Sequence, residues 1–223
     1  MTYETHAPYD DDLDDKDRNF WTATAEGYDA WIANDFKDQY EVNWNILAKH
    51  VDPNIRLLDV GCGPGSLSIR LSRRCHEVWG VDVTPEMIRV AEEKSACEPA
   101  NVYFQEADAC ALPFENHSFD TVMSVNALQT MDQPEMAISE MHRVLRPGGE
   151  LLLITYCYGE ATRSEHNALL DWAVRFDGRA MWHSFTFTQL GALLAAKGFE
   201  VVEAERIWEG PVVAFLRGRA IHS

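Results

Sequence analysis

Short apolar runs alternate with amphipathic segments along most of the chain. The runs are rich in Leu, Val and Ile, which is typical of strands buried on both faces. Between them, apolar residues recur at intervals of three and four, which predicts helices. The alternation predicts an α/β fold with a mostly parallel sheet. The predicted strands are 56–60, 77–82, 101–106, 119–125, 150–156, 201–207 and 212–217. The predicted helices are 20–31, 39–50, 66–74, 84–97, 134–145 and one around 169–176. A last helix is predicted to begin at a capping box formed by Thr186 and Gln189 and to end at residue 197.

The first strand ends in a turn with three glycines at alternate positions. Gly61, Gly63 and Gly65 lack a Cβ, so the backbone can adopt positive φ angles and a ligand can approach the main chain closely. The apolar residues that follow predict a helix that begins near Ser66 and directs its free N–H groups toward the bound molecule. The turn therefore predicts a cradle for a small molecule, and a tight turn without a ligand is the alternative.

The spacing of the glycines limits the class of ligand. In a dinucleotide-binding fingerprint the third glycine stands three residues after the second, and Ser66 occupies that position here. The order Asp59-x-Gly61-x-Gly63-x-Gly65 instead resembles motif I of the class I S-adenosylmethionine-dependent methyltransferases. The resemblance implies that the cofactor is S-adenosyl-L-methionine, released as S-adenosyl-L-homocysteine. It also implies that the cofactor contacts Asp59, Gly61, Cys62, Gly63 and Gly65.

A second carboxylate follows the next predicted strand. Asp82 lies about 20 residues past the first glycine, where nucleotide-binding α/β folds place an acid on the ribose hydroxyls. Its two oxygens can accept hydrogen bonds from two vicinal hydroxyls. Thr84 and Pro85 supply a cap and a first position for the following helix, so we do not expect Asp82 to serve as the cap. We assign Asp82 and the adjacent Val83 to the cofactor site.

Two further phrases match the same superfamily. The segment Asp108-Ala-Cys-Ala-Leu-Pro-Phe114 looks like its adenine-binding segment, which implies that Asp108 accepts a hydrogen bond from the adenine amino group and that the backbone of Ala109 meets the ring. The phrase Arg143-Val-Leu-Arg-Pro-Gly-Gly149 matches at the end of a helix, where its role is structural. The resemblance covers roughly residues 20–217. It implies a Rossmann-like, doubly wound, mostly parallel seven-stranded sheet with an antiparallel C-terminal hairpin strand, and it is nearest to the small-molecule methyltransferases of ubiquinone and menaquinone biosynthesis.

The chain is predicted to consist of a tail, a cap and one catalytic domain. Residues 1–18 carry a run of aspartates and are expected to form a mobile acidic tail. Residues 19–50 carry aromatic residues at helical spacing and are expected to form a helical cap, in which Tyr28 faces the cofactor; for most of these aromatics, ordinary core packing is the alternative. Residues 51–223 are expected to form the methyltransferase domain that the resemblance implies, with an insert at about 156–186.

The acceptor is expected beside the end of the fourth strand. Class I enzymes place the transferred methyl group there, which implies that Asn126 lies at the cofactor. The motifs of DNA amino-methylating and cytosine-C5 enzymes are absent from this strand end. Relatives often carry His near positions 129 and 130, where this chain has Gln and Thr, so the candidate base is His183 in the insert. The candidate substrate residues are Gln129, Tyr156, Tyr158, Arg179 and Trp182, and ordinary packing is the alternative for each.

The composition of the chain limits which binding partners and which cellular compartment are expected. The formal charge of −17 over 223 residues repels nucleic-acid backbones, so no nucleic-acid partner is expected. The five cysteines are scattered without a C-x-x-C pair, which predicts reduced thiols and no metal site. No apolar run approaches the roughly 20 residues that a membrane span needs, and the N-terminus does not resemble a signal peptide. We expect a cytoplasmic protein without integral membrane association, as a monomer or a homodimer.

Together these features predict an S-adenosylmethionine-dependent methyltransferase. It would move a methyl group to a small-molecule acceptor by in-line displacement, with much of the catalysis due to positioning. A catalytically silent cofactor-binding or partner-binding module carries the same motifs and is the main alternative. An NAD-dependent oxidoreductase is disfavoured by the glycine spacing. A thiol enzyme that methylates metalloids is a lesser variant, because Cys62 and Cys110 lie inside the cofactor motifs.

Overall fold

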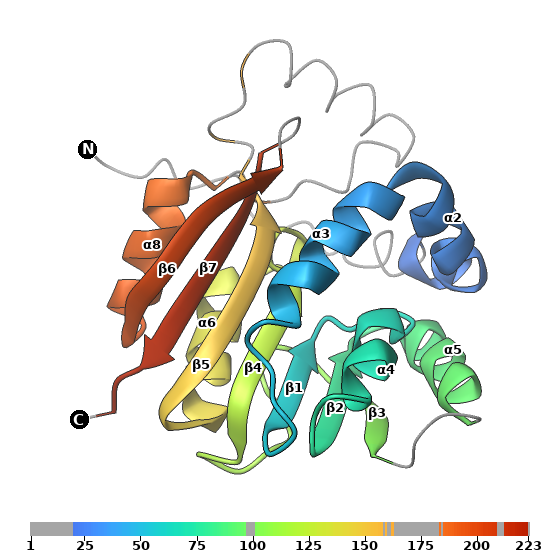
Figure 1. The fold of residues 1–223 in the computed structure, drawn as a ribbon, viewed down its shortest axis with the longest axis horizontal. Helices are drawn as coiled ribbons and strands as arrows, with labels where there is room; N and C mark the ends of the chain where they lie inside the picture. Colours follow the sequence, from blue (N-terminus) through green and yellow to red (C-terminus); the bar gives the residue numbers. More distant parts are fainter. Residues whose placement is uncertain are drawn as a thin grey trace.

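The computed structural model describes residues 20–96, 101–157, 159, 162, 183, 185–208 and 212–222. Within these residues a seven-stranded sheet has the order β3-β2-β1-β4-β5-β7-β6 (Figure 1). Its strands are β1 (Arg56–Val60), β2 (Glu77–Asp82), β3 (Val102–Glu106), β4 (Phe119–Val125), β5 (Leu145–Tyr156), β6 (Phe199–Trp208) and β7 (Val213–Ala220). The first five pair in parallel, and β7 runs antiparallel between β5 and β6. The predicted mostly parallel, Rossmann-like sheet with an antiparallel hairpin strand is confirmed.

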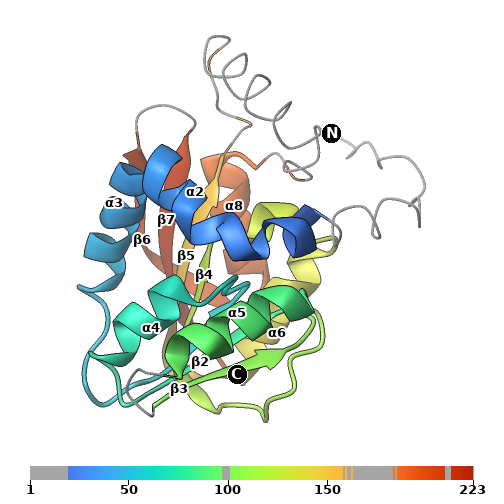
Figure 2. The ribbon, with the colours of Figure 1, turned by 90° about the vertical axis from the view of Figure 1, so that its right-hand side faces the viewer.

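Helices cover both faces of the sheet (Figure 2). On one face, α3 (Lys37–Leu47) and α4 (Ser66–Ser72) pack through Leu47, Ile69 and Leu71 against buried residues of the strands. On the other face, α6 (Pro134–Val144) and α8 (Phe187–Ala196) bury their apolar stripes. α5 (Pro85–Ser95) lies beside β2 and β3. The strands are therefore buried on both sides, as their continuous apolar runs predict.

The N-terminal region folds as several short helices rather than the two predicted. Residues 20–24 are helical, a 3₁₀ turn η1 (Ala25–Gly27) follows, and α2 (Tyr28–Asp35) continues beyond the predicted end at residue 31. Ala25 in this turn packs against Met87 and Val90 of α5, so the break is fixed by a tertiary contact. α3 then begins at Lys37 rather than Gln39, after a non-helical junction at Phe36.

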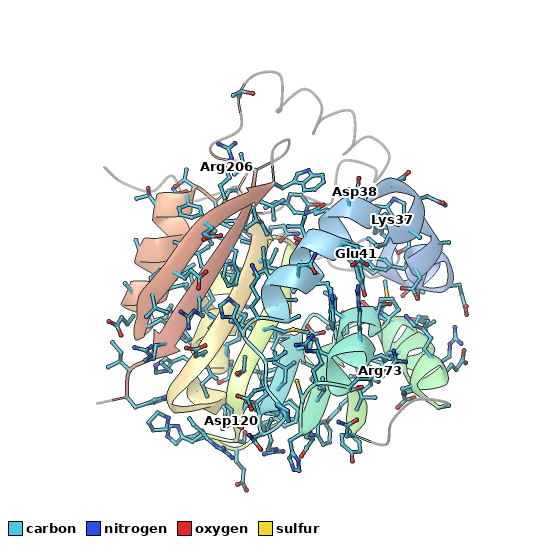
Figure 3. The ribbon with its side chains drawn as sticks, in the orientation of Figure 1. Lys37, Asp38, Glu41, Arg73, Asp120 and Arg206 are labelled. Carbon is cyan, nitrogen blue, oxygen red and sulfur yellow. The ribbon has the colours of Figure 1, made fainter. Side chains whose placement is uncertain are left out.

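Polar contacts fasten these helices to the sheet domain. Glu41, labelled on α3 in Figure 3, forms an ion pair with Arg70 of α4, and the distance between Arg70 Nη1 and Glu41 Oε1 is 2.8 Å. The guanidinium of Arg70 also lies 4.0 Å from the ring centre of Trp44. From α2, Asp29 accepts a hydrogen bond from Ser66 at the glycine turn and pairs with Lys94 of α5. The cap is therefore linked to the elements that surround the turn.

β5 begins at Leu145 rather than at the predicted residue 150. Leu145 pairs with Phe119 before a register shift, and Gly149 lies where a Cβ would meet the carbonyl oxygen of Asp120 at 2.9 Å. Nearby, Arg143 donates hydrogen bonds to the carbonyl oxygens at 112 and 114, at 2.9 and 2.7 Å. The segment 143–149 thus holds the loop at 108–114 in place, which agrees with the structural role implied for that segment.

The C-terminal elements follow the sequence pattern closely. Thr186 caps α8 by accepting from the Gln189 N–H at 3.1 Å, while the Gln189 side chain accepts from the Thr186 N–H at 2.8 Å, so the capping box is confirmed. β6 and β7 form the expected antiparallel pair and are longer than predicted. Several predictions fall outside the described residues: the tail at 1–18, the helix around 169–176, and the side chains Tyr158, Arg179 and Trp182.

Candidate active site

A cavity of about 310 Å³ lies at the carboxyl ends of β1, β2, β4 and β5. The strand order reverses between β1 and β4, and open α/β sheets bind their ligands at such a switch point. Residues of α2 and α3 line the cavity on its far side. Of the predicted site residues, Tyr28, Asp59, Gly61, Cys62, Gly63, Asp82, Val83, Asp108, Ala109, Asn126, Gln129 and Tyr156 line it, whereas Gly65 and His183, both described, do not.

All three glycines of the turn have positive φ angles, but only one has open space around it. A Cβ at Gly61 would lie 2.4 Å from the Cβ of Ala127, and one at Gly65 would lie 2.5 Å from the ring of Phe104. At Gly63 the nearest atom would be the Met87 sulfur, at 4.0 Å. Gly61 and Gly65 are therefore required by packing within the protein. Gly63 is the position where a ligand can approach the main chain.

The N–H groups of the turn are engaged inside the protein. Those of Gly61 and Cys62 both bond to the Val81 carbonyl, at 2.8 and 3.0 Å. The Gly63 N–H bonds to the Asp82 carboxylate at 2.9 Å, and the Gly65 N–H bonds to the Cys62 carbonyl at 3.1 Å. The turn is thus preorganised by its own hydrogen bonds, and these donors are already occupied.

Asp82 holds the turn and the start of α5 together. Its second oxygen accepts from the Thr84 N–H at 2.9 Å. Thr84 does occupy the N-cap position, with Pro85 at the first helical position, but its side chain makes no capping bond. Thr84 and not Asp82 is therefore the N-cap residue, as expected, although Asp82 also accepts local hydrogen bonds from the backbone N–H groups of Gly63 and Thr84. Burial raises the pKa of Asp82, against the opposing effect of the backbone hydrogen bonds.

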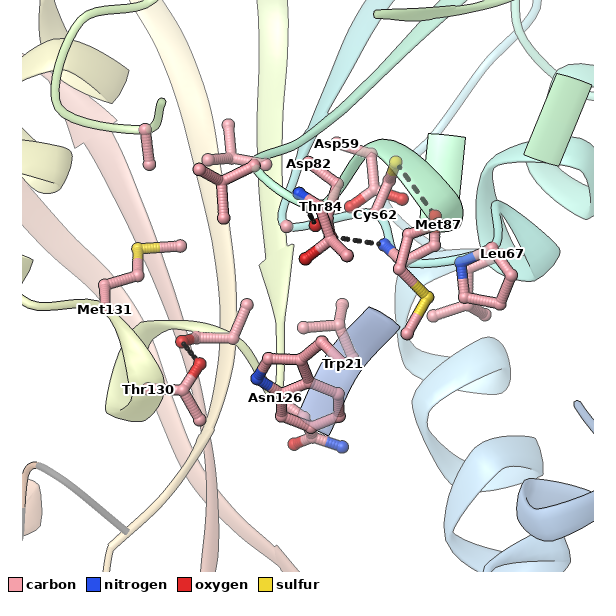
Figure 4. A pocket seen from close by; sticks show the side chains of 18 of the residues that line it. Trp21, Asp59, Cys62, Leu67, Asp82, Thr84, Met87, Asn126, Thr130 and Met131 are labelled. Atoms are coloured by element: carbon pink, nitrogen blue, oxygen red, sulfur yellow. Dashed lines mark hydrogen bonds between the residues drawn. The ribbon is translucent and has the colours of Figure 1, made fainter. Parts of the chain in front are cut away.

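Asp59 is the most deeply buried carboxylate of the cavity. Its side chain is 3% exposed and accepts a hydrogen bond from Ser68 in α4. Burial raises the pKa of Asp59 to about 7. Figure 4 shows Asp59 and Asp82 close together beside Cys62. The floor of the cavity therefore carries acidic groups.

The raised pKa of Asp59 predicts a pH dependence of stability. In the unfolded chain this carboxyl loses its proton near pH 4, but in the folded protein it does so only near pH 7. The contribution of Asp59 to the free energy of unfolding is therefore complete below pH 4 and is lost as the pH rises through about 7. Asp59→Asn keeps an acceptor for Ser68 and does not titrate. Denaturant unfolding at about pH 5 and about pH 8 should show a steeper loss of stability in the wild type than in the variant. Equal changes in both proteins would contradict the assignment.

The end of β4 carries an asparagine with a positive φ angle, and a glutamine that is hydrogen-bonded through both ends of its amide follows it. Asn126 has a φ of +54°, and its Oδ1 is buried without a hydrogen-bond partner in the described part of the chain. Gln129, in the 3₁₀ turn η2 (Leu128–Thr130), donates to the Asn126 carbonyl at 2.7 Å and accepts from the Thr155 hydroxyl at 2.7 Å. Its amide therefore braces the cavity wall, while Asn126 keeps an acceptor for a ligand.

The candidate base and the candidate tyrosines differ in their surroundings. His183 donates its backbone N–H to the Gln129 carbonyl at 3.1 Å, and its ring stacks on Phe185, so its catalytic role stays a prediction. Burial raises the pKa of Tyr156 to about 12, and it also raises that of Tyr28. At neutral pH both hydroxyls therefore keep their protons and act as hydrogen-bond donors.

Two amides that the sequence analysis did not select face the same cavity. Gln39 and Asn43 line it from α3 and are only 5% and 3% exposed. The third buried residue of this helix is Leu47, so two of the three buried positions on α3 are polar. The signal in the sequence was the spacing i, i+4 and i+8 on one predicted helix, where an inward stripe is normally apolar.

The charges around the cavity have one sign. Among the described lining residues there are five aspartates, Asp29, Asp59, Asp82, Asp108 and Asp132, and no Lys, Arg or His. Within the same part of the chain, no group of His, Cys, Asp or Glu has the arrangement of a metal site. Burial raises the pKa of Cys110 to about 11 and holds the pKa of Cys62 well above its ordinary value, so neither thiol is an active nucleophile at neutral pH.

Comparison with known proteins agrees with this architecture. The family profile described as "Methyltransferase domain" matches residues 58–153. A phosphatidylethanolamine N-methyltransferase from Cereibacter sphaeroides is 31% identical over 202 residues, which cover 87% of this chain and 96% of the relative. The chain therefore belongs to the class I S-adenosylmethionine-dependent methyltransferases. Its cofactor is S-adenosylmethionine.

Other relatives share part of their length with this chain. A demethylmenaquinone methyltransferase from Thermus thermophilus is 38% identical over 103 residues, 45% of this chain and 47% of that protein. The chain spans less than half the length of the first curated relatives that it matches. The structure of Phospholethanolamine N-methyltransferase 2 from Haemonchus contortus superposes with a TM-score of 0.75 at 21% identity, covering 92% of this chain and 60% of that one, and this likeness concerns the fold. No helix among the described residues is long and apolar enough to cross a membrane.

Proposed function

We propose that this protein transfers a methyl group from S-adenosylmethionine to a small-molecule acceptor bound in the cavity beneath α2 and α3. The observation that carries the proposal is the convergence of three separate sequence motifs on one cavity. The glycine turn, Asp82 and the segment that begins at Asp108 come from different strand ends and all line the same space. In a nucleotide-binding fold, that space is where the ligand binds.

The residues present fit the cofactor. We assign Asp82 to the ribose hydroxyls and Asp108 with Ala109 to the adenine, while Gly63 leaves room for the cofactor to approach the turn. The unpaired Oδ1 of Asn126 offers an acceptor near the end of β4. When bound, S-adenosylmethionine supplies a methyl group on a positively charged sulfur. The acidic floor formed by Asp59 and Asp82 is complementary to that charge.

The acceptor side of the cavity favours catalysis by positioning. Gln129 and Tyr156 border this side, and their hydrogen bonds to Thr155 and Gln39 restrict their side chains. The tyrosine hydroxyls stay protonated at neutral pH and do not act as bases, so we assign to this side of the cavity the roles of holding the acceptor at attack distance and excluding water. The relatives are named for phosphatidylethanolamine and demethylmenaquinone, which makes amines and quinol-like rings the first acceptors to test.

Calorimetry followed by an acceptor screen tests the proposal. S-adenosylhomocysteine should bind with 1:1 stoichiometry, and NAD should not bind under the same conditions. With S-adenosylmethionine present, a panel of amines, phenols, thiols and carboxylic acids should then contain an acceptor that produces S-adenosylhomocysteine. Absence of S-adenosylhomocysteine binding would contradict the proposal. Binding without turnover on any acceptor class would favour the silent cofactor-binding module.

A further inference from the structure

Two polar atoms on α3 are buried at the cavity without a hydrogen-bond partner in the described residues. They are Nε2 of Gln39 and Oδ1 of Asn43, on side chains that are more than nine-tenths buried. An unpaired amide atom that is removed from water destabilises the folded protein. Two such atoms on the inward face of one helix therefore point to a bound molecule that completes their hydrogen bonds.

The two amides offer opposite hydrogen-bonding groups. The Tyr156 hydroxyl donates to Oε1 of Gln39 at 3.0 Å, which occupies the carbonyl side of that amide and leaves its NH₂ as the available group. Asn43 has an unpaired oxygen. Because residues four apart are neighbours on a helix, the cavity receives a donor and an acceptor side by side.

The described lining residues offer an anion no cationic partner. The N–H groups of Gly61, Cys62 and Gly63 are already bonded within the protein. Among the described lining residues there is no Lys, Arg or His. A carboxylate bound near α3 therefore depends on neutral donors, and Gln39 supplies one.

Building on the proposed function, we propose that Gln39 and Asn43 bind the amino-acid tail of S-adenosylmethionine. The NH₂ of Gln39 donates to the tail carboxylate, and Oδ1 of Asn43 accepts from the tail ammonium. A zwitterion carries these two groups on one carbon, which matches a donor and an acceptor one helical turn apart. The pair would make the cofactor site discriminate against nucleosides that lack the tail.

Two acidic substitutions one turn apart should have opposite effects. Gln39→Glu keeps an oxygen for the Tyr156 hydroxyl but replaces the donor with a group that repels a carboxylate. Asn43→Asp keeps the acceptor and adds a charge that attracts an ammonium. Asn45→Asp, at an exposed position of the same helix, is the control for added negative charge on α3.

Calorimetry with two probes measures the effect of the tail alone. S-adenosylhomocysteine carries the tail, and 5′-methylthioadenosine lacks it. We expect Gln39→Glu to weaken S-adenosylhomocysteine about tenfold or more and to leave 5′-methylthioadenosine nearly unchanged. Asn43→Asp should bind S-adenosylhomocysteine at least as tightly as the wild type, and Asn43→Leu should bind it more weakly. Circular dichroism and thermal unfolding establish that each variant is folded.

Different outcomes separate this inference from the proposed function. If the wild type does not bind S-adenosylhomocysteine, the proposed function fails and this inference fails with it. If the wild type binds and Gln39→Glu binds equally well, only the tail assignment is overturned. Equal losses for both probes would also overturn it, because they would show a general disturbance of the site rather than recognition of the tail.

Discussion

Replacing Asp82 with alanine is expected to weaken S-adenosylhomocysteine binding by about 100-fold or more while the protein stays folded. The carboxylate lines the cavity at the end of β2, where it can accept hydrogen bonds from both ribose hydroxyls. Hydrogen bonds to a charged group contribute about 1.5 to 3 kcal/mol each, so the loss of two has a large effect. Calorimetric titration of the variant and the wild type measures it directly.

The effect of Asp82→Ala on folding should be much smaller because two contributions oppose each other. The variant loses the hydrogen bonds from the N–H groups of Gly63 and Thr84. It also removes a carboxylate whose pKa is raised by burial, which means that ionisation of this group is less favourable in the folded protein than in the unfolded chain. The thermal unfolding midpoint should therefore change little.

A charge-matched control separates ligand binding from net charge. Asp38→Ala removes a carboxylate from the exposed side of α3, outside the cavity, and should bind S-adenosylhomocysteine as the wild type does. A folded Asp82→Ala protein with undiminished affinity would show that the carboxylate serves only to hold the glycine turn and the start of α5.

The strands could be predicted because each one has a local signature. Buried parallel strands are continuous apolar runs, and the carboxyl ends of β1 and β2 are marked by glycines or a carboxylate, so those ends were found to the residue. The start of β5 was missed because the Pro-Gly-Gly segment is typical of a helix stop. The extended pairing of Leu145 with Phe119 depends on the neighbouring strand, which no local pattern reveals.

In the candidate site, too, the residues with a local sequence motif could be predicted, and those that depend on distant parts of the chain could not. Motif residues from separate strands line one cavity because the carboxyl ends of parallel strands meet at one edge of a sheet. Gln39 was missed because a glutamine on an amphipathic helix is normally a surface residue. Its burial depends on Tyr156, which lies 117 residues away in the sequence and supplies the hydrogen bond to its carbonyl oxygen.

Alanine substitutions at two glycines of the turn should separate packing from ligand binding. Gly61→Ala places a methyl group 2.4 Å from the Cβ of Ala127 at a φ of +77°, so we expect a loss of about 2 to 5 kcal/mol in the free energy of unfolding. Gly63→Ala meets no atom nearer than 4.0 Å, so strain at a φ of +51° should cost only about 1 to 2 kcal/mol.

The order of the two variants reverses for ligand binding. Gly63 lines the cavity with open space at its Cβ position, so a methyl group there occupies room that the cofactor needs, and S-adenosylhomocysteine affinity should fall about tenfold or more in a folded protein. Denaturant unfolding ranks the stabilities, and calorimetry ranks the affinities. If Gly61→Ala were as stable as Gly63→Ala, the contact with Ala127 would not limit the turn. If Gly63→Ala bound S-adenosylhomocysteine as well as the wild type, the cofactor would not approach the main chain at this glycine.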